Sequence, residues 1–135
     1  IPGAEGWQLS NAPGTGMAVH LASLELFEAA GMERIGQKRD LMTAYLSFVV
    51  HEISSNTPGS EQFEIITPSD PKKRGAQLSI KATGKGRALF DSLTALGVTA
   101  DWREPNVIRV APAPLYNSFE DCYWFGQHLK LALQG

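Results

Sequence analysis

The sequence predicts an α+β domain in which a small, mainly antiparallel sheet has helices packed on one face. Two observations support this fold class. Apolar residues recur at helical spacing in four segments, whereas four shorter segments are rich in β-branched residues or alternate polar and apolar side chains. The resulting order is helix, long helix, strand, strand, helix, strand, strand, helix, which is typical of a layered α+β fold. At 135 residues, the chain has the length of one domain.

The expected elements cover most of the chain. Helices are predicted over residues 17–30, 32–54, 87–96 and 118–133, and strands over residues 63–66, 77–81, 98–102 and 107–110. The first helix is apolar on most sides and is expected to be largely covered. The second, at about 23 residues or 34 Å, is long enough to brace a larger body. Asn117 and Glu120 have the spacing of a capping pair for the last helix.

The N-terminal region differs in composition from the rest. Residues 1–16 contain six glycines and prolines, which favour an irregular segment with at most a very short strand within residues 6–11. We expect residues 1–30 to be an interdomain segment and linking helix, and residues 31–135 to be a C-terminal small domain. The chain begins at Ile1 without a methionine, which suggests part of a longer protein.

Charge and composition exclude several partners. Twelve basic and 14 acidic residues leave a net charge of -2, so there is no electrostatic basis for nucleic-acid binding or for an anionic membrane surface. No apolar run is long enough for a membrane span. The single cysteine, Cys122, excludes an internal disulfide and favours a reducing compartment, so we expect a cytoplasmic protein.

Few residues suggest catalysis within this chain. The three histidines lie in separate predicted helices, and no cysteine or serine has a base beside it in the sequence. Cys122 falls on the apolar face of the last helix and is expected in the core. We therefore expect no metal site and no catalytic residue in this segment.

Arg109 is the unusual residue, because it lies inside a β-branched strand. Alternation places Val107 and Arg109 on one face and Ile108 and Val110 on the other. If the Val107 face were core, Arg109 would need a partner or a ligand, since an unpaired buried charge is costly. A guanidinium can bind a carboxylate through two parallel hydrogen bonds. The pattern leaves open a solvated residue, a structural ion pair or an anion-binding residue.

Short sequence blocks suggest which alternative applies. They comprise residues 6–13, 66–68, 74–78, 97–98, 105–106, 108–112 and 114–119, with Asp101, Arg103 and Asp121. In this order they resemble the C-terminal part of the kynureninases, over essentially the whole chain. The last block is specific to these enzymes rather than to vitamin-B6 enzymes generally.

The resemblance implies a fold, a reaction and three site residues. Kynureninases are homodimeric pyridoxal 5'-phosphate enzymes of the aspartate-aminotransferase fold (fold type I), and hydrolyse L-kynurenine or 3-hydroxykynurenine to anthranilate or 3-hydroxyanthranilate and L-alanine. Arg109 matches the arginine that binds the substrate α-carboxylate. Asn11 matches an asparagine that contacts cofactor and substrate, and Ser10 is its neighbour at the cofactor.

The family's Schiff-base lysine and phosphate-binding residues belong to the N-terminal domain that precedes this segment. The chain alone is therefore expected to be inactive and not to hold the cofactor. Two alternatives remain: the C-terminal domain of another fold-type I enzyme, such as a cysteine desulfurase relative, or a non-catalytic α+β module that binds a carboxylate. If the chain is a fragment, the first helix should expose apolar surface.

Overall fold

The computed structural model describes residues 2–8, 10–56 and 63–134. Its contacts divide the chain into two compact units, Ile1–Arg34 and Ile35–Gly135. The first unit contains the 3-10 helix η1 (Ala4–Trp7), helix α1 (Gly14–Ala30) and the start of helix α2 (Met32–Asn56). The rest of α2, from Ile35 onward, and all later elements belong to the second unit.

Within the first unit, the local structure differs in two places from what the sequence suggested. Gly6 and Trp7 belong to η1, and no strand occurs in the described parts of residues 6–11. Helix α1 begins at Gly14 rather than Met17, because the backbone N–H of Met17 already donates to the Pro13 carbonyl at 2.9 Å. Pro13 has φ -72° and extended backbone, which suits the residue before a helix.

Helix α1 has no buried residue in the described structure. Val19 and Leu26 are 69% and 67% exposed, on a helix that carries only three strongly polar side chains, His20, Glu25 and Glu28. The expectation that this helix is largely covered is therefore not met by the described residues. The alternative expectation, exposed apolar surface on the first helix, is confirmed.

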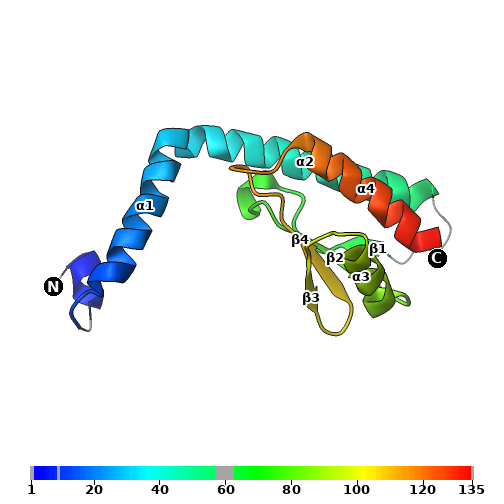
Figure 1. Cartoon of the computed structure of the whole chain (residues 1–135). Helices are drawn as coiled ribbons and strands as arrows, with labels where there is room; N and C mark the ends of the chain where they lie inside the picture. Colours follow the sequence, from blue (N-terminus) through cyan, green and yellow to red (C-terminus); the bar gives the residue numbers. More distant parts are fainter. Residues whose placement is uncertain (1, 9, 57–62, 135) are drawn as a thin grey trace. The chain divides into compact units, whose positions relative to one another are not determined.

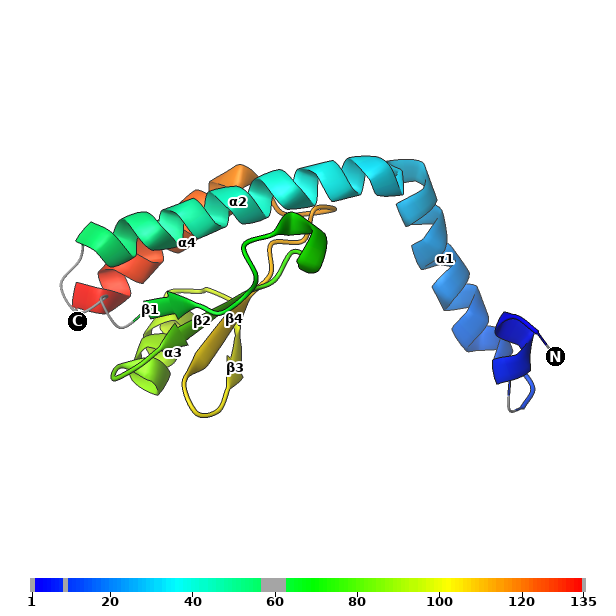
Figure 2. The same ribbon diagram turned by 180° about the vertical axis from the view of Figure 1, so that it is seen from behind.

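The second unit forms the predicted α+β arrangement. Strands β1 (Phe63–Ile65), β2 (Leu78–Ala82), β3 (Asp101–Arg103) and β4 (Val107–Val110) make one antiparallel sheet in the order β1-β2-β4-β3. The 3-10 helix η2 (Pro71–Lys73) lies between β1 and β2, and helices α3 (Gly86–Ala95) and α4 (Phe119–Gln134) complete the unit. In Figures 1 and 2, α4 lies beside α2 in both views.

One face of the sheet forms the core. In β2, Leu78, Ile80 and Ala82 are buried while the residues between them are not. The register pairs Leu78 with Val110 and Ile80 with Ile108, so the buried residues of the two central strands share one face. Buried side chains from α2, α3 and α4 complete a single cluster with this face: Met42, Leu46, Val50, Leu89, Leu93, Cys122, Phe125, Leu129 and Leu133.

Close packing of α4 against α2 depends on Gly126. A Cβ atom at this position would overlap Cγ1 of Val49 and would lie 3.3 Å from Cδ1 of Ile53. Both neighbours are β-branched side chains of α2, with restricted rotamers. Glycine at position 126 therefore permits the short separation between the two helices.

The strand predicted over residues 98–102 forms at Asp101–Arg103 instead. The backbone N–H of Val98 donates to the Leu93 carbonyl at 3.0 Å, so the end of α3 uses a group that a strand would need. Gly97, at φ 87°, makes the left-handed turn that ends the helix. The hairpin gains Arg103 at its other end, where it pairs with Val107.

Candidate functional site

Arg109 lies in the middle of β4, on the face of the sheet opposite the core. Its cross-strand partners are Ser79 on β2 and Asp101 on β3, whereas the neighbouring Ile108 and Val110 are buried. The Val107 face is therefore not the core face. Arg109 remains partly accessible, with 31% of its side chain exposed.

Asp101 is the carboxylate that pairs with Arg109. Its Oδ2 accepts a hydrogen bond from Arg109 Nε at 2.6 Å and also contacts Arg109 Nη2. The same oxygen lies 3.0 Å from Arg103 Nε. Two guanidinium groups thus share one carboxylate, which leaves one net positive charge in this cluster.

A guanidinium has five N–H donors, and the bonds to Asp101 use only its Nε–Nη2 edge. The edge formed by Nη1 and Nη2 has the geometry for two parallel bonds to a further carboxylate. The cluster therefore combines a structural ion pair with the capacity to bind an anion. Both of these sequence-based alternatives are compatible with this geometry.

Two side chains hold the loop after β4: Lys38 of α2 and Asn117 of the loop itself. Lys38 Nζ donates to the carbonyl oxygens of Pro114 and Asn117, both at 2.8 Å. Asn117 Oδ1 accepts from the backbone N–H of Ala113 at 2.8 Å. The two Lys38 bonds connect the residues that follow Arg109 to α2, and the Asn117 bond closes the loop itself.

Helix α4 is capped one residue later than the sequence suggested. Ser118, not Asn117, is the capping residue: its Oγ accepts from Asp121 N at 3.2 Å, and Asp121 Oδ2 accepts from Ser118 N at 2.7 Å. This is a reciprocal capping box in which Asp121 replaces the expected Glu120. The backbone bond from Ser118 and the amide of Asn117 hold the pKa of Asp121 below its usual value.

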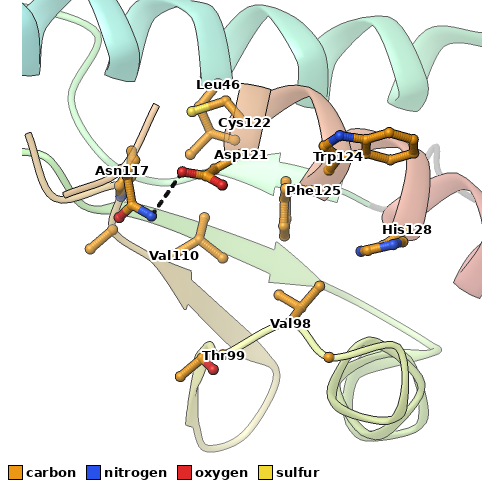
Figure 3. Close-up of a pocket in the computed structure, with 13 residues that line it drawn as sticks. Leu46, Val98, Thr99, Val110, Asn117, Asp121, Cys122, Trp124, Phe125 and His128 are labelled. Atoms are coloured by element: carbon orange, nitrogen blue, oxygen red, sulfur yellow. Dashed lines mark hydrogen bonds between the residues drawn. The ribbon is translucent and has the colours of Figure 1, made fainter. Parts of the chain in front are cut away.

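A pocket of about 320 Å³ lies between the end of β4, the loop after α3 and helix α4 (Figure 3). Its polar groups include Thr99, Asn117, Asp121 and His128, and the other lining residues are Leu46, Gly97, Val98, Val110, Ala111, Pro112, Cys122, Trp124 and Phe125. Burial, with the nearby Asp121 charge, raises the pKa of the Cys122 thiol, so it stays protonated at neutral pH. Arg109 is not among the lining residues.

Sequence reasoning did not identify this pocket. Its walls come from four separate segments, and none of them contains a recognisable motif for a ligand. Cys122 is 2% exposed, as expected for a core residue.

Ser10 and Asn11 lie in the first unit, whereas Arg109 lies in the second. Ser10 and Asn11 are exposed, and the Ser10 carbonyl accepts a 2.9 Å hydrogen bond from Gln8 Nε2. Their hydroxyl and amide groups suit the oxygen atoms of a phosphorylated pyridine cofactor.

The described residues provide little else for chemistry. Among residues 2–8, 10–56 and 63–134, no group of histidine, cysteine or acidic side chains could hold a metal ion. No helix in the same residues is long and apolar enough to cross a membrane. Lys38 and Lys85 donate to backbone carbonyls, and Lys81 pairs with Glu64 at 3.1 Å.

Comparison with known proteins identifies the family. Residues 35–129, most of the second unit, match the family model described as the kynureninase C-terminal domain. The chain belongs to the kynureninase family. The resemblance inferred from the sequence blocks is therefore confirmed.

Curated kynureninases match the chain throughout its length. The protein of Flavobacterium johnsoniae is 53% identical over 135 residues, which are 100% of this chain and 31% of that protein. The protein of Christiangramia forsetii is 55% identical over 129 residues, and that of Xanthomonas campestris pv. campestris 47% over 132; each match covers 96% of this chain and 30% of the relative. The chain thus spans about a third of the length of these kynureninases.

Proposed function

We propose that this chain is the C-terminal part of an enzyme that hydrolyses L-kynurenine, or 3-hydroxykynurenine, to an anthranilate and L-alanine. The observation that carries the proposal is Arg109, a partly exposed guanidinium on the sheet face opposite the core, with one edge left for a carboxylate. Membership of the kynureninase family supports kynurenine as the substrate, rather than the cysteine that a cysteine desulfurase relative would use.

In this proposal, Arg109 binds the substrate α-carboxylate. Two parallel charge-assisted hydrogen bonds would fix both the position and the rotation of the amino acid. Orientation of this kind lowers the entropic part of the barrier, because the scissile Cβ–Cγ bond is held in one geometry. The net positive charge of the Asp101–Arg103–Arg109 cluster would be balanced by the bound carboxylate.

We further propose that Ser10 and Asn11 contact pyridoxal 5'-phosphate and, for Asn11, the substrate. Their exposed hydroxyl and amide groups are suitable hydrogen-bonding partners for it. When bound, this cofactor supplies an electron sink for the amino acid. The lysine that carries it would come from the N-terminal domain, and the complete enzyme would be a cytoplasmic homodimer.

The test is to assay the full-length enzyme with L-kynurenine and with 3-hydroxykynurenine, following the fluorescence of the anthranilate product. We expect hydrolysis by the full-length protein and none by the 135-residue chain supplied with pyridoxal phosphate. Release of sulfide from L-cysteine without any anthranilate would favour a cysteine desulfurase instead. A non-catalytic carboxylate-binding module would be favoured by two results together: the isolated chain binds L-alanine tightly, and the full-length protein has no activity.

A further inference from the structure

We propose that Asp101 is the residue that positions Arg109 for substrate binding. In this inference, which rests on the proposed function, Asp101 holds one edge of the guanidinium so that the other edge faces the substrate carboxylate. Asp101 itself does not touch the substrate. It acts through Arg109.

The register of the β3–β4 hairpin brings the two residues together. Asp101 and Arg109 are direct cross-strand partners, and therefore project from the same face of the sheet. Their eight-residue separation includes the hairpin turn, so the short β3–β4 hairpin sets their spacing. Asp101 Oδ2 accepts a short, charge-assisted hydrogen bond from Arg109 Nε at 2.6 Å.

The edge of the guanidinium that Asp101 occupies determines which N–H donors of Arg109 remain for the substrate. The hydrogen bond from Nε and the ion-pair contact of Nη2 with Oδ2 restrain rotation about the end of the arginine side chain, which otherwise has many rotamers. At least three of the five donors are left, and they belong to Nη1 and Nη2. A substrate carboxylate can use one donor from each of these nitrogens without displacing Asp101.

Arg103 keeps Asp101 from neutralising the site. Its Nε lies 3.0 Å from the same Oδ2, so the carboxylate is shared between two cations. Two positive charges and one negative charge leave an excess of one positive charge. Asp101 can therefore orient Arg109 while the cluster still attracts an anion.

A contribution to folding alone does not account well for this arrangement. The side chains of Arg109 and Asp101 are 31% and 49% exposed, and exposed ion pairs contribute little to stability. Loss of Asp101 should therefore affect substrate binding more than the unfolding midpoint. This difference separates a positioning role from a structural one.

The experiment uses the full-length enzyme with Asp101→Ala, Asp101→Asn, Arg109→Ala and the double variant Asp101→Ala/Arg109→Ala. We expect Asp101→Ala to raise the KM for kynurenine about tenfold to a hundredfold, with a smaller change in kcat. In the Arg109→Ala background the same substitution should have no further effect, because the group it positions is gone. Asp91→Ala, which removes an exposed ion pair with Arg87 on α3, is the matched control and should leave KM unchanged.

A second ligand distinguishes positioning from general damage. The amine that corresponds to kynurenine without its α-carboxylate should inhibit wild-type and Asp101→Ala enzymes with the same inhibition constant. An equal loss of affinity for both ligands would contradict the inference, as would an unchanged KM for kynurenine in both Asp101 variants. If Arg109→Ala itself leaves kynurenine kinetics unchanged, the carboxylate-binding role of Arg109 fails first, and the two failures remain distinguishable.

Discussion

Lys38 on α2 donates a 2.8 Å hydrogen bond to the carbonyl oxygen of Asn117, a residue 79 positions later in the chain. The same ammonium group binds the Pro114 carbonyl at 2.8 Å. One side chain thus ties both ends of the turn after β4 to the long helix. Because Arg109 precedes this turn, Lys38 connects the backbone near the candidate site to the core.

Replacing Lys38 with Met should destabilise the second unit. The substitution keeps the apolar stem but removes a charged donor to two carbonyls, at a cost of about 1–3 kcal/mol. Urea unfolding followed by circular dichroism measures the effect. Lys130→Met, at an exposed position on α4, is the control and should change the midpoint little. Equal effects of the two substitutions would contradict the role assigned to Lys38.

Arg109→Ala in the full-length enzyme should reduce kcat/KM for kynurenine while leaving cofactor attachment intact. Loss of a two-bond contact to a carboxylate costs about 2–4 kcal/mol, which is roughly a 30- to 1000-fold decrease. Steady-state kinetics and the visible absorption of the bound cofactor provide the two measurements. Arg109→Lys should retain charge without the planar fork and give an intermediate value. Unchanged kinetics for Arg109→Ala would exclude this arginine from substrate binding.

The lowered pKa of Asp121 predicts a pH-dependent contribution to stability. Hydrogen bonds from Ser118 N and the Asn117 amide favour the charged form in the folded state. This contribution is present above the pKa of an unfolded aspartate, about 3.9, and is lost as the pH falls through the lower folded value. The difference in midpoint between wild type and Asp121→Asn should be largest near neutrality and shrink below about pH 4. A difference independent of pH would show that the carboxylate charge is unimportant for the cap.

Gly126→Ala should destabilise the packing between α2 and α4. The added methyl group would overlap Val49 Cγ1, and such overpacking costs about 1–3 kcal/mol, partly offset by the higher helix propensity of alanine. Gly36→Ala on α2 is the matched control, because no heavy atom lies within 4 Å of the new Cβ; it should stabilise by about 0.5–1 kcal/mol. Adding Val49→Ala to Gly126→Ala should relieve the overlap. Thermal unfolding of the four proteins tests this, and a stabilising Gly126→Ala would contradict it.

Local patterns were sufficient to predict much of the fold. The α+β class, the bounds of β4 and the approximate limits of α2, α3 and α4 follow from periodicity and from glycine or proline at the ends of elements. These features depend on neighbours within a few residues, so one sequence contains the required information. The shift of the α4 cap to Ser118 and Asp121 shows the limit, because several polar residues there had suitable spacing.

The sequence blocks were also sufficient to place the chain in its family, whereas the role of Arg109 stays a prediction. Only the tertiary structure decided which face of β4 is buried, that Asp101 holds Arg109, and that Lys38 anchors the following turn. Alternation defines two faces of a strand but does not say which one the helices cover. That choice, and every long-range partner, depends on strand register and helix packing, which arise from contacts between residues far apart in the sequence.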